Sequence, residues 1–297
     1  MALARQDDRF ADFDRHRRVV DTASGPAGYV DVGDGPVALF VHGVGTSSHL
    51  WRRVIDLVDA HRRCIAVDLP AHGSTPVAPD QDLSLGALAR FVADVRTALD
   101  LGEVDLVAND TGGAVAQIVA ARDPARLRSL TLTDCDTHDR VPPKAFLPSV
   151  LAARAGLLAP ALRRLARDPD RARRRMFGSG YQDPDRLGDD LLREWIRPLA
   201  TAESARRYQS LIAALRPDDL LAVEPQLARL QVPTLIVWGT DDAFFPLTDA
   251  YWLRDTIPGA GEVVELAGAR LFFPDERADE LAEPLLRHWA ATAPTVS

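Results

Sequence analysis

Residues 106–115 of the chain read Leu-Val-Ala-Asn-Asp-Thr-Gly-Gly-Ala-Val, and this stretch decides the fold. An apolar run typical of a buried strand passes into a run typical of a helix with almost no loop between them. Small residues, Ala108 and Gly112, stand two positions before and two positions after Asp110. This pattern predicts a sharp strand-to-helix turn with Asp110 at its apex, where the side chain is presented above the sheet.

The residue at the apex depends on the frame in which the turn is taken. A frame one residue earlier places Asn109 at the apex between Val107 and Thr111, which are sterically poor neighbours in a tight turn. A frame one residue later places Thr111 there, between Asn109 and Gly113, and is weaker than the Asp110 frame. A second interpretation is that Asp110 only caps the following helix, because Asp is a preferred N-cap residue.

Short apolar runs alternate with longer amphipathic runs along the rest of the chain. This alternation predicts an α/β fold, with a mostly parallel, twisted sheet flanked by helices. The predicted strands cover residues 18–22, 28–32, 37–42, 63–69, 104–108, 127–133, 233–238 and 262–266. The predicted helices cover residues 48–60, 84–101, 112–122, 247–257 and 279–290.

The alternation stops after Asp136 and resumes near residue 229. Residues 137–228 contain Pro142-Pro143, several short helical patterns and an arginine-rich stretch, and their pattern indicates no strand. We therefore expect a core of residues 1–136 and 229–297 interrupted by a helical insertion, residues 137–228, that forms a cap. The arginines of residues 163–175 are expected on a solvated helix face, with a gate for anionic substrates as the alternative.

The composition argues against several classes of function. The net charge of -8 argues against nucleic-acid binding, which needs a basic surface. No apolar stretch is long enough for a membrane span, and the polar N-terminus lacks the apolar region of a signal peptide. We therefore expect no membrane partner and a cytoplasmic location. Two cysteines exclude a disulfide framework, and no metal-ligand spacing or nucleotide-binding glycine motif is present, so we expect no metal and no cofactor.

Three further segments lie where one known fold needs them. His42-Gly43-Val44-Gly45 follows a predicted buried strand, Asp68-Leu-Pro-Ala-His-Gly-Ser-Thr75 follows the next strand, and Trp238-Gly-Thr-Asp-Asp-Ala-Phe-Phe-Pro246 follows a later one. Together with the turn at Asp110, these segments resemble the α/β-hydrolase superfamily over essentially the whole chain outside the insertion. Any one of them alone would be weak, whereas the four together are specific.

The resemblance implies a role for each matching residue. Asp110 takes the place of the nucleophile and Asp242 that of the acid, while the backbone N–H groups of Val44 and Thr111 would form the oxyanion hole. Asp134 lies where some dehalogenases hold their acid instead. An aspartate in the place of the nucleophile resembles the branch with haloalkane dehalogenases, fluoroacetate dehalogenases and epoxide hydrolases. In that branch the carboxylate attacks an sp³ carbon, and a histidine-activated water hydrolyses the resulting ester.

The chain departs from that family at the catalytic histidine. The family's histidine lies in a GHxxxxE segment after the last strand, and residues 268–276 read Gly-Ala-Arg-Leu-Phe-Phe-Pro-Asp-Glu. The position falls on Leu271 or Phe272, depending on the frame. His288 is expected to pack on the final helix. His138, at the start of the insertion, is the candidate replacement, with a hinge or an exposed loop as its alternative role.

The insertion is expected to enclose an apolar pocket above the carboxyl ends of the strands. Helical spacing alone favours core packing for most aromatic residues of the insertion. Tyr181 and Tyr208 are candidates for the two cap tyrosines that activate the epoxide oxygen in epoxide hydrolases. The candidate substrate-binding residues are His42, His49, Phe146, Tyr181, Trp195, Tyr208, Phe244, Phe245 and Phe272.

These observations predict an enzyme that acts on a small, largely apolar molecule, with Asp110 as nucleophile or as acid and base. One alternative is a non-hydrolytic cyclisation, elimination or rearrangement, in which Asp110 and either Asp134 or Asp242 divide the proton transfers. Another is a binder of small molecules without turnover. The sequence leaves the oligomeric state open, a homodimer included.

Overall fold

The computed structural model describes residues 10–292 of the 297-residue chain. The first nine and last five residues, which belong to the predicted core segments, lie outside the described residues, and these nine are half of the polar N-terminal stretch. No single helix among residues 10–292 is long and apolar enough to cross a membrane. Only two adjacent helical segments taken together, residues 144–154 and 158–165, meet the length and composition required, and they are bent by 112°.

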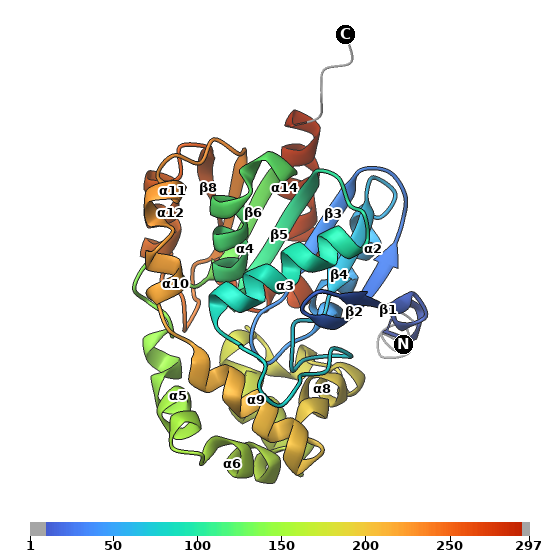
Figure 1. Cartoon of the computed structure of the whole chain (residues 1–297), viewed down its shortest axis with the longest axis vertical. Coiled ribbons are helices and arrows are strands. Elements are labelled where there is room, and N and C mark those ends of the chain that lie inside the picture. The colour runs from blue at the N-terminus through green and yellow to red at the C-terminus, as the bar shows by residue number, and fades with distance from the viewer. Residues whose placement is uncertain (1–9, 293–297) are drawn as a thin grey trace.

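Eight strands form one twisted sheet in the described part of the chain (Figure 1). The strand order is β1-β2-β4-β3-β5-β6-β7-β8. The pairs β1–β2 and β2–β4 are antiparallel, and the other five pairs are parallel. The predicted α/β fold is confirmed. The strands are β1 (Arg17–Thr22), β2 (Gly25–Val32), β3 (Val37–Val41), β4 (Arg63–Val67), β5 (Val104–Asp110), β6 (Leu127–Cys135), β7 (Thr234–Gly239) and β8 (Ala260–Leu266).

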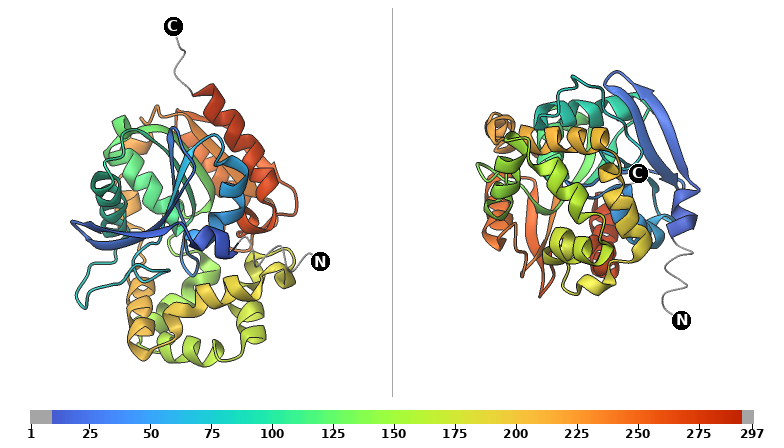
Figure 2. Two further views of the ribbon diagram at one scale, coloured as in Figure 1. Left: turned by 90° about the vertical axis from the view of Figure 1, so that its right-hand side faces the viewer. Right: turned by 90° about the horizontal axis from the view of Figure 1, so that it is seen from below.

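Helices cover both faces of the sheet because its central strands are apolar on both sides. Every residue of β5 is buried. Helices α3 and α4 lie on one face, and α2 and α14 lie on the other (Figure 2). The helices of the core are η1 (Ser48–Trp51), α2 (Arg52–Val58), α3 (Leu85–Ala98), α4 (Thr111–Arg122), η2 (Pro124–Arg126), α12 (Leu247–Thr256), α13 (Phe273–Glu276) and α14 (Ala278–Ala291).

All residues between β6 and β7 are described by the structure, and they form helices and no strand. The helices of residues 144–214 gather at one end of the molecule, beyond the end of the sheet where Asp110 lies, whereas those of residues 218–227 pack beside α4 of the core (Figure 1). The elements are η3 (Lys144–Phe146), α5 (Leu147–Arg154), α6 (Leu158–Leu165), α7 (Pro169–Ala172), η4 (Arg173–Phe177), η5 (Gly178–Gly180), η6 (Pro184–Arg186), α8 (Asp189–Ile196), η7 (Arg197–Leu199), α9 (Ala202–Ala214), α10 (Asp218–Leu221) and α11 (Glu224–Leu227).

Candidate active site

The turn between β5 and α4 has no loop residue, since the strand ends at Asp110 and the helix begins at Thr111. Asp110 has φ 59° and ψ -136°, a conformation that is strained for any residue with a side chain. The surroundings require small residues. A Cβ on Gly112 would lie 2.4 Å from the carbonyl oxygen of His42, and a Cβ on Gly43 would lie 2.3 Å from the Cβ of Asp110. Asp110 is therefore the apex of the turn.

The side chain of Asp110 does not act as an ordinary helix cap. An ordinary N-cap residue has an extended backbone, and its side chain accepts from the second or third residue of the helix. The Asp110 carboxylate instead accepts from the backbone N–H of Thr111, the first residue of α4, and from the Thr111 hydroxyl at 2.9 Å. The capping interpretation does not account for this geometry.

The environment of Asp110 opposes its ionisation. Burial raises the pKa of the carboxyl to about 7, although hydrogen bonds from the Thr111 backbone and side chain and from the backbone N–H of Val44 act against this increase. The nearby charge of Asp242 also raises the pKa. The two N–H groups that the sequence assigns to an oxyanion hole thus face the Asp110 carboxylate itself. The group is poised to exchange a proton near neutral pH.

Thr111 connects Asp110 to a second buried carboxyl group, Asp136. The Thr111 hydroxyl oxygen lies 2.9 Å from Oδ1 of Asp110 and 3.0 Å from Oδ2 of Asp136. Burial, with the Asp110 charge, raises the pKa of Asp136 well above its usual range, although the hydrogen bond from Thr111 acts against this increase. The Thr111 hydroxyl is within donating distance of both carboxyl groups, and since it carries one hydrogen it donates to one of them at a time.

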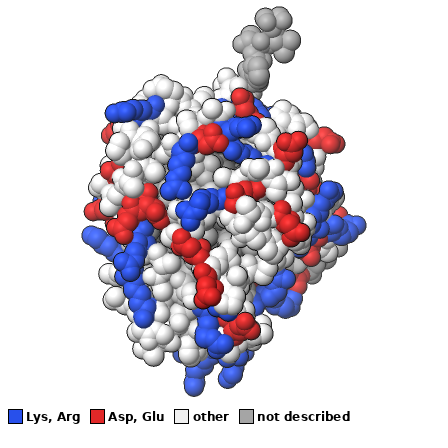
Figure 3. Space-filling model, in the orientation of Figure 1, with Lys and Arg blue, Asp and Glu red and all other residues white. Residues whose placement is uncertain are grey.

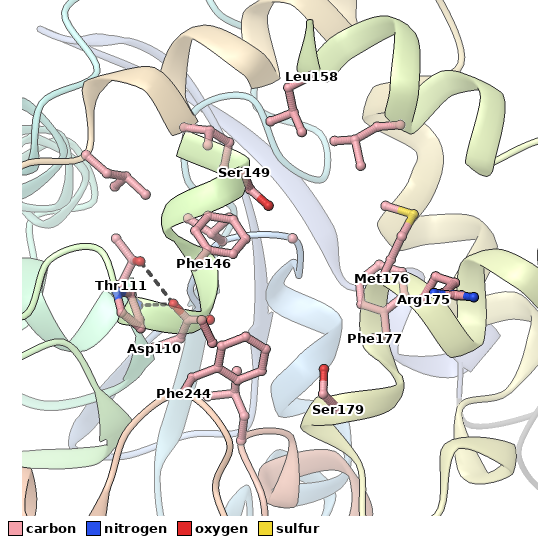
Figure 4. Close-up of a pocket in the computed structure, with 18 of the residues that line it drawn as sticks. Asp110, Thr111, Phe146, Ser149, Leu158, Arg175, Met176, Phe177, Ser179 and Phe244 are labelled. Atoms are coloured by element: carbon pink, nitrogen blue, oxygen red, sulfur yellow. Dashed lines mark hydrogen bonds between the residues drawn. The ribbon is translucent and has the colours of Figure 1, made fainter. Parts of the chain in front are cut away.

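Asp110 faces a cavity of about 270 Å³ between the sheet and the helices that follow β6. Figure 4 shows Asp110 and Thr111 on one side of this cavity and Met176, Phe177 and Ser179 across from them. Most lining side chains are apolar, which indicates a site for a small apolar molecule. The lining residues are Val44, Gly45, Asp110, Thr111, Pro143, Ala145, Phe146, Ser149, Leu158, Leu162, Leu165, Arg175, Met176, Phe177, Ser179, Tyr208, Ile212, Leu215, Phe244, Phe245 and Leu271.

The structure brings some of the predicted pocket residues to the cavity and leaves others out. Phe146, Tyr208, Phe244 and Phe245 line it, as do the oxyanion-hole candidates Val44 and Thr111. Tyr181, Trp195 and Phe272 do not. Their rings pack on one another and on Phe177, with centroid separations of 5.2 to 6.4 Å, and the Tyr181 hydroxyl donates to Asp275 at 2.7 Å. The prediction that these three bind substrate is corrected: they form an aromatic core.

His42 and His49 are structural residues, contrary to the prediction that they bind substrate. The ring of His42 is fully buried, accepts from the backbone N–H of Leu69 at 2.9 Å and lies 2.7 Å from the carbonyl oxygen of Gly43. It therefore fixes the turn after β3. His49 is buried and stacks on Phe10 with ring centroids 4.3 Å apart. Neither ring lines the cavity.

His138 does not reach the cavity. Its side chain is 43% exposed, hydrogen-bonds to Glu224 and lies against the ring of Trp252 at 5.2 Å between centroids. His138 therefore occupies a partly exposed position at the entrance to the insertion, as in the alternative to a catalytic role. His138 is thus not placed to act as a base on a water beside Asp110, and no histidine stands among the described residues that line the cavity.

Leu271 is one of the two residues on which the resemblance places the family's histidine. Its side chain lines the cavity with Asp110, and its backbone N–H hydrogen-bonds to Asp242. Its carbonyl oxygen accepts from the Asn109 side chain at 3.2 Å. Phe272, the residue of the other frame, lies in the aromatic core instead. A leucine cannot take a proton from water.

The two acids outside the cavity lining, Asp242 and Asp134, lie close enough to influence each other's pKa. Burial, with the nearby Asp242 charge, raises the pKa of Asp134 well above its usual range. The Asp242 carboxylate accepts from the backbone N–H groups of Phe244 and Phe245 at 2.6 and 2.7 Å. A hydrogen bond between the two side chains raises the pKa of Asp134 and lowers that of Asp242. Both acids that the resemblance assigns are therefore buried and in contact with each other.

Sequence reasoning missed Asp136, although the segment Asp134-Cys135-Asp136 contains the signal. Two acids at the end of a central parallel strand are costly to bury unless they serve a site at that end of the sheet. The resemblance assigns a role to Asp134 and none to Asp136. Among residues 10–292 no group of three or more His, Cys, Asp or Glu side chains could hold a metal ion.

Comparison with known proteins agrees with this geometry. The sequence profile of the alpha/beta hydrolase fold family matches residues 36–276. A haloalkane dehalogenase of Agrobacterium fabrum is 30% identical over 88% of this chain and 86% of its own length. The solved structure of the haloalkane dehalogenase DatA from Agrobacterium tumefaciens has a TM-score of 0.78 at 25% identity, and covers 93% of this chain and 97% of its own. An epoxide hydrolase, CorEH, has a TM-score of 0.77 at 18% identity over 93% and 99%, which shows the fold alone. The chain belongs to the alpha/beta hydrolase fold family.

Proposed function

We propose that this protein opens a carbon–halogen or carbon–oxygen bond at an sp³ carbon of a small apolar molecule, with Asp110 as the nucleophile. The observation that carries the proposal is a carboxylate at the apex of a strained turn, facing an enclosed apolar cavity. The insertion, residues 137–228, acts as the cap of this cavity and excludes water from the attacking oxygen. The relationship to a haloalkane dehalogenase supports the same chemistry.

In the first step an oxygen of Asp110 attacks the carbon and forms an alkyl ester, while the electron pair of the broken bond leaves with the halide or the alkoxide oxygen. Tyr208 supports an epoxide as the electrophile. Its hydroxyl makes no hydrogen bond to any described residue, it lines the cavity, and the Asp110 charge acts on its pKa. Burial raises this pKa, so the hydroxyl keeps its proton until the epoxide oxygen takes it.

The second step, hydrolysis of the ester, is slow in this mechanism. The N–H groups of Val44 and Thr111 would stabilise the oxyanion that forms when water attacks the ester carbonyl. The base that activates this water in the family is replaced by Leu271. A positioned base contributes a factor of roughly 10² to 10⁴, so we expect the ester on Asp110 to accumulate.

The pKa of Asp110 favours a second candidate function, a proton-transfer reaction without hydrolysis. A carboxyl group with a pKa of about 7 can both take and give a proton near neutral pH. The hydrogen-bonded series Asp136–Thr111–Asp110 is a source of that proton. A cyclisation, elimination or rearrangement would use this pair and would need no hydrolytic water. A binder of small molecules without turnover is the remaining alternative.

The test combines intact-protein mass spectrometry with product analysis. The protein is incubated with a panel of small epoxides and haloalkanes in water enriched in ¹⁸O. An epoxide should add its whole mass to the chain, and a haloalkane should add its alkyl group in place of one hydrogen. The adduct should map to Asp110 and be absent in Asp110→Asn. During slow turnover, ¹⁸O should enter the Asp110 carboxylate.

The outcomes separate the candidates. No adduct and no product with any electrophile would exclude the nucleophilic role. Products that form without an adduct and without ¹⁸O incorporation, and that are lost in Asp110→Asn, would support the proton-transfer reaction. Tight binding of small apolar molecules without either would support the binder.

A further inference from the structure

We propose that the outer face of α5 and α6 docks on the surface of an anionic lipid bilayer. This inference goes beyond the proposed reaction and does not depend on it. The sequence predicts no membrane partner because it holds no spanning segment, but peripheral docking needs only an apolar face with positive charge beside it.

The first observation is an apolar ridge on the outside of the insertion. Five large apolar side chains are exposed among the described residues, and three of them, Leu147, Leu151 and Leu157, lie within eleven consecutive residues. Leu147 and Leu151 are four residues apart on α5 and therefore share one helix face. They are 43% and 56% exposed, and Leu157, just before α6, is 65% exposed. We call these three residues the leucine ridge.

The second observation is the charge of the same segment. Residues 140–167 carry six basic and no acidic side chains, although the whole chain has a net charge of -8. Within the described residues the side chains of Arg163, Arg164 and Arg167 make no ion pair. Figure 3 shows basic side chains projecting from the end of the molecule where Figure 1 places α6. Unpaired arginines beside exposed leucines complement an apolar surface that carries negative charge.

The third observation is a hollow on the surface beside α6. Four arginines and four apolar residues line it: Arg163, Ala166, Arg167, Arg193, Ile196, Arg197, Leu199 and Ala200. Arg193 and Arg197 are paired with acids on their own helical turn, whereas Arg163 and Arg167 are not. Cationic and apolar groups in one hollow match a lipid phosphate with the first part of its acyl chains. We call this the arginine hollow.

The position of this face gives the docking a use. The opposite side of the same helices lines the cavity: Leu158, Leu162 and Leu165 of α6 and Ser149 of α5. Only the thickness of one helix therefore separates the leucine ridge from the space above Asp110. Apolar molecules partition into bilayers, and docking of this face would present the cavity to them at the surface where they are concentrated.

The test is co-sedimentation of the full chain with lipid vesicles, measured without any reaction so that it is independent of the proposed function. Vesicles of phosphatidylcholine alone are compared with vesicles in which about a third of the lipid is anionic phosphatidylglycerol. We expect binding to the anionic vesicles only. Raising the salt from about 0.1 to 1 M, which shortens the Debye length from about 10 to 3 Å, should weaken it.

Two double variants examine the two parts of the surface. Arg164→Gln/Arg167→Gln should weaken partitioning by roughly twentyfold, since one basic residue near an anionic surface is worth about fivefold. Leu151→Ser/Leu157→Ser should weaken it by at least tenfold. The matched controls, Arg126→Gln/Arg229→Gln and Val19→Ser/Leu57→Ser, alter exposed residues of the same types outside the insertion and should bind like the wild type. Thermal unfolding checks that each variant is folded.

Three results would overturn the proposal. The first is no binding to anionic vesicles at low salt. The second is binding that the four substitutions in the insertion leave unchanged. The third is self-association of the wild type that Leu151→Ser/Leu157→Ser abolishes in sedimentation experiments without lipid, which would assign the leucine ridge to a second copy of the chain.

Discussion

The hydroxyl oxygen of Thr111 lies 3.0 Å from Oδ2 of Asp136 and 2.9 Å from Oδ1 of Asp110, and so joins two buried carboxyl groups. The hydroxyl favours the charged form of Asp110 because it donates to the carboxylate. The first prediction concerns this hydrogen bond.

Thr111→Val should raise the pKa of Asp110 further above 7, because the carboxylate loses a donor while burial is unchanged. A hydrogen bond to a charged group is worth about 1.5 to 3 kcal/mol, which corresponds to roughly one to two pKa units. The rate of ester formation requires the ionised carboxylate, so its rise with pH should move to higher pH. The measurement is the adduct-formation rate between pH 5 and 9.

The matched control is Thr131→Val, since Thr131 is a buried threonine whose hydroxyl has no partner. Its pH profile should match that of the wild type. An unchanged profile in Thr111→Val would mean that the hydroxyl does not tune Asp110.

Asp110→Asn should stabilise the protein at pH 8 and much less at pH 4. Burial raises the pKa of Asp110 in the folded protein to about 7, whereas the pKa in the unfolded chain is near 4. The protonated carboxyl therefore contributes fully to stability below pH 4, and this contribution is lost as the pH rises through 7. Asparagine does not ionise and avoids the loss, which is about 4 kcal/mol at most. Urea unfolding at the two pH values measures the difference.

Asp105→Asn provides the contrast. Asp105 is buried but accepts from Arg62, Arg128 and Ser129 at 2.7 to 2.9 Å. Its substitution should destabilise the protein at both pH values, because it leaves buried arginines without their charge partner. Equal stability changes in the two variants would show that burial at the turn does not oppose the Asp110 charge.

Leu271→His should increase ester hydrolysis by roughly 10² to 10⁴. The substitution places an imidazole on the cavity wall beside Asp242, to which the Leu271 backbone N–H already donates. Asp242 would orient the ring, and the ring would activate water. Decay of the Asp110 adduct, followed by mass spectrometry, measures the gain.

Phe272→His is the control for the other frame of the sequence. Phe272 is part of the aromatic core and does not line the cavity. Its substitution should lower stability without faster hydrolysis. A gain in Phe272→His but not in Leu271→His would reverse the assignment of the histidine position.

Tyr208→Phe should slow reaction with epoxides by roughly 10² or more, and should affect haloalkanes much less. Only the epoxide needs a proton on its departing oxygen. Tyr181→Phe is the control, because the Tyr181 hydroxyl donates to Asp275 away from the cavity. It should destabilise the chain and leave the ratio of the two rates unchanged. Equal losses for both electrophiles in Tyr208→Phe would assign Tyr208 to binding instead of proton transfer.

Local sequence determined the elements and the turn. Each predicted strand and core helix is present, with ends that differ by a few residues, because burial on one or both faces imposes a periodicity that neighbouring residues show. The apex at Asp110 was also decided locally. The backbone of such a turn approaches its neighbours so closely that only small residues are accepted at positions 43 and 112.

The tertiary structure alone decided which side chains share the cavity. Leu271 and Phe272 are adjacent in sequence, yet one lines the cavity and the other packs in the aromatic core. Tyr208 and Tyr181 differ in the same way, and Asp136 reaches Asp110 only through a hydroxyl on another element. These outcomes depend on how helices far apart in the chain pack over the sheet. Periodicity reports whether a side chain is buried, but the neighbours it meets there are set by packing across elements.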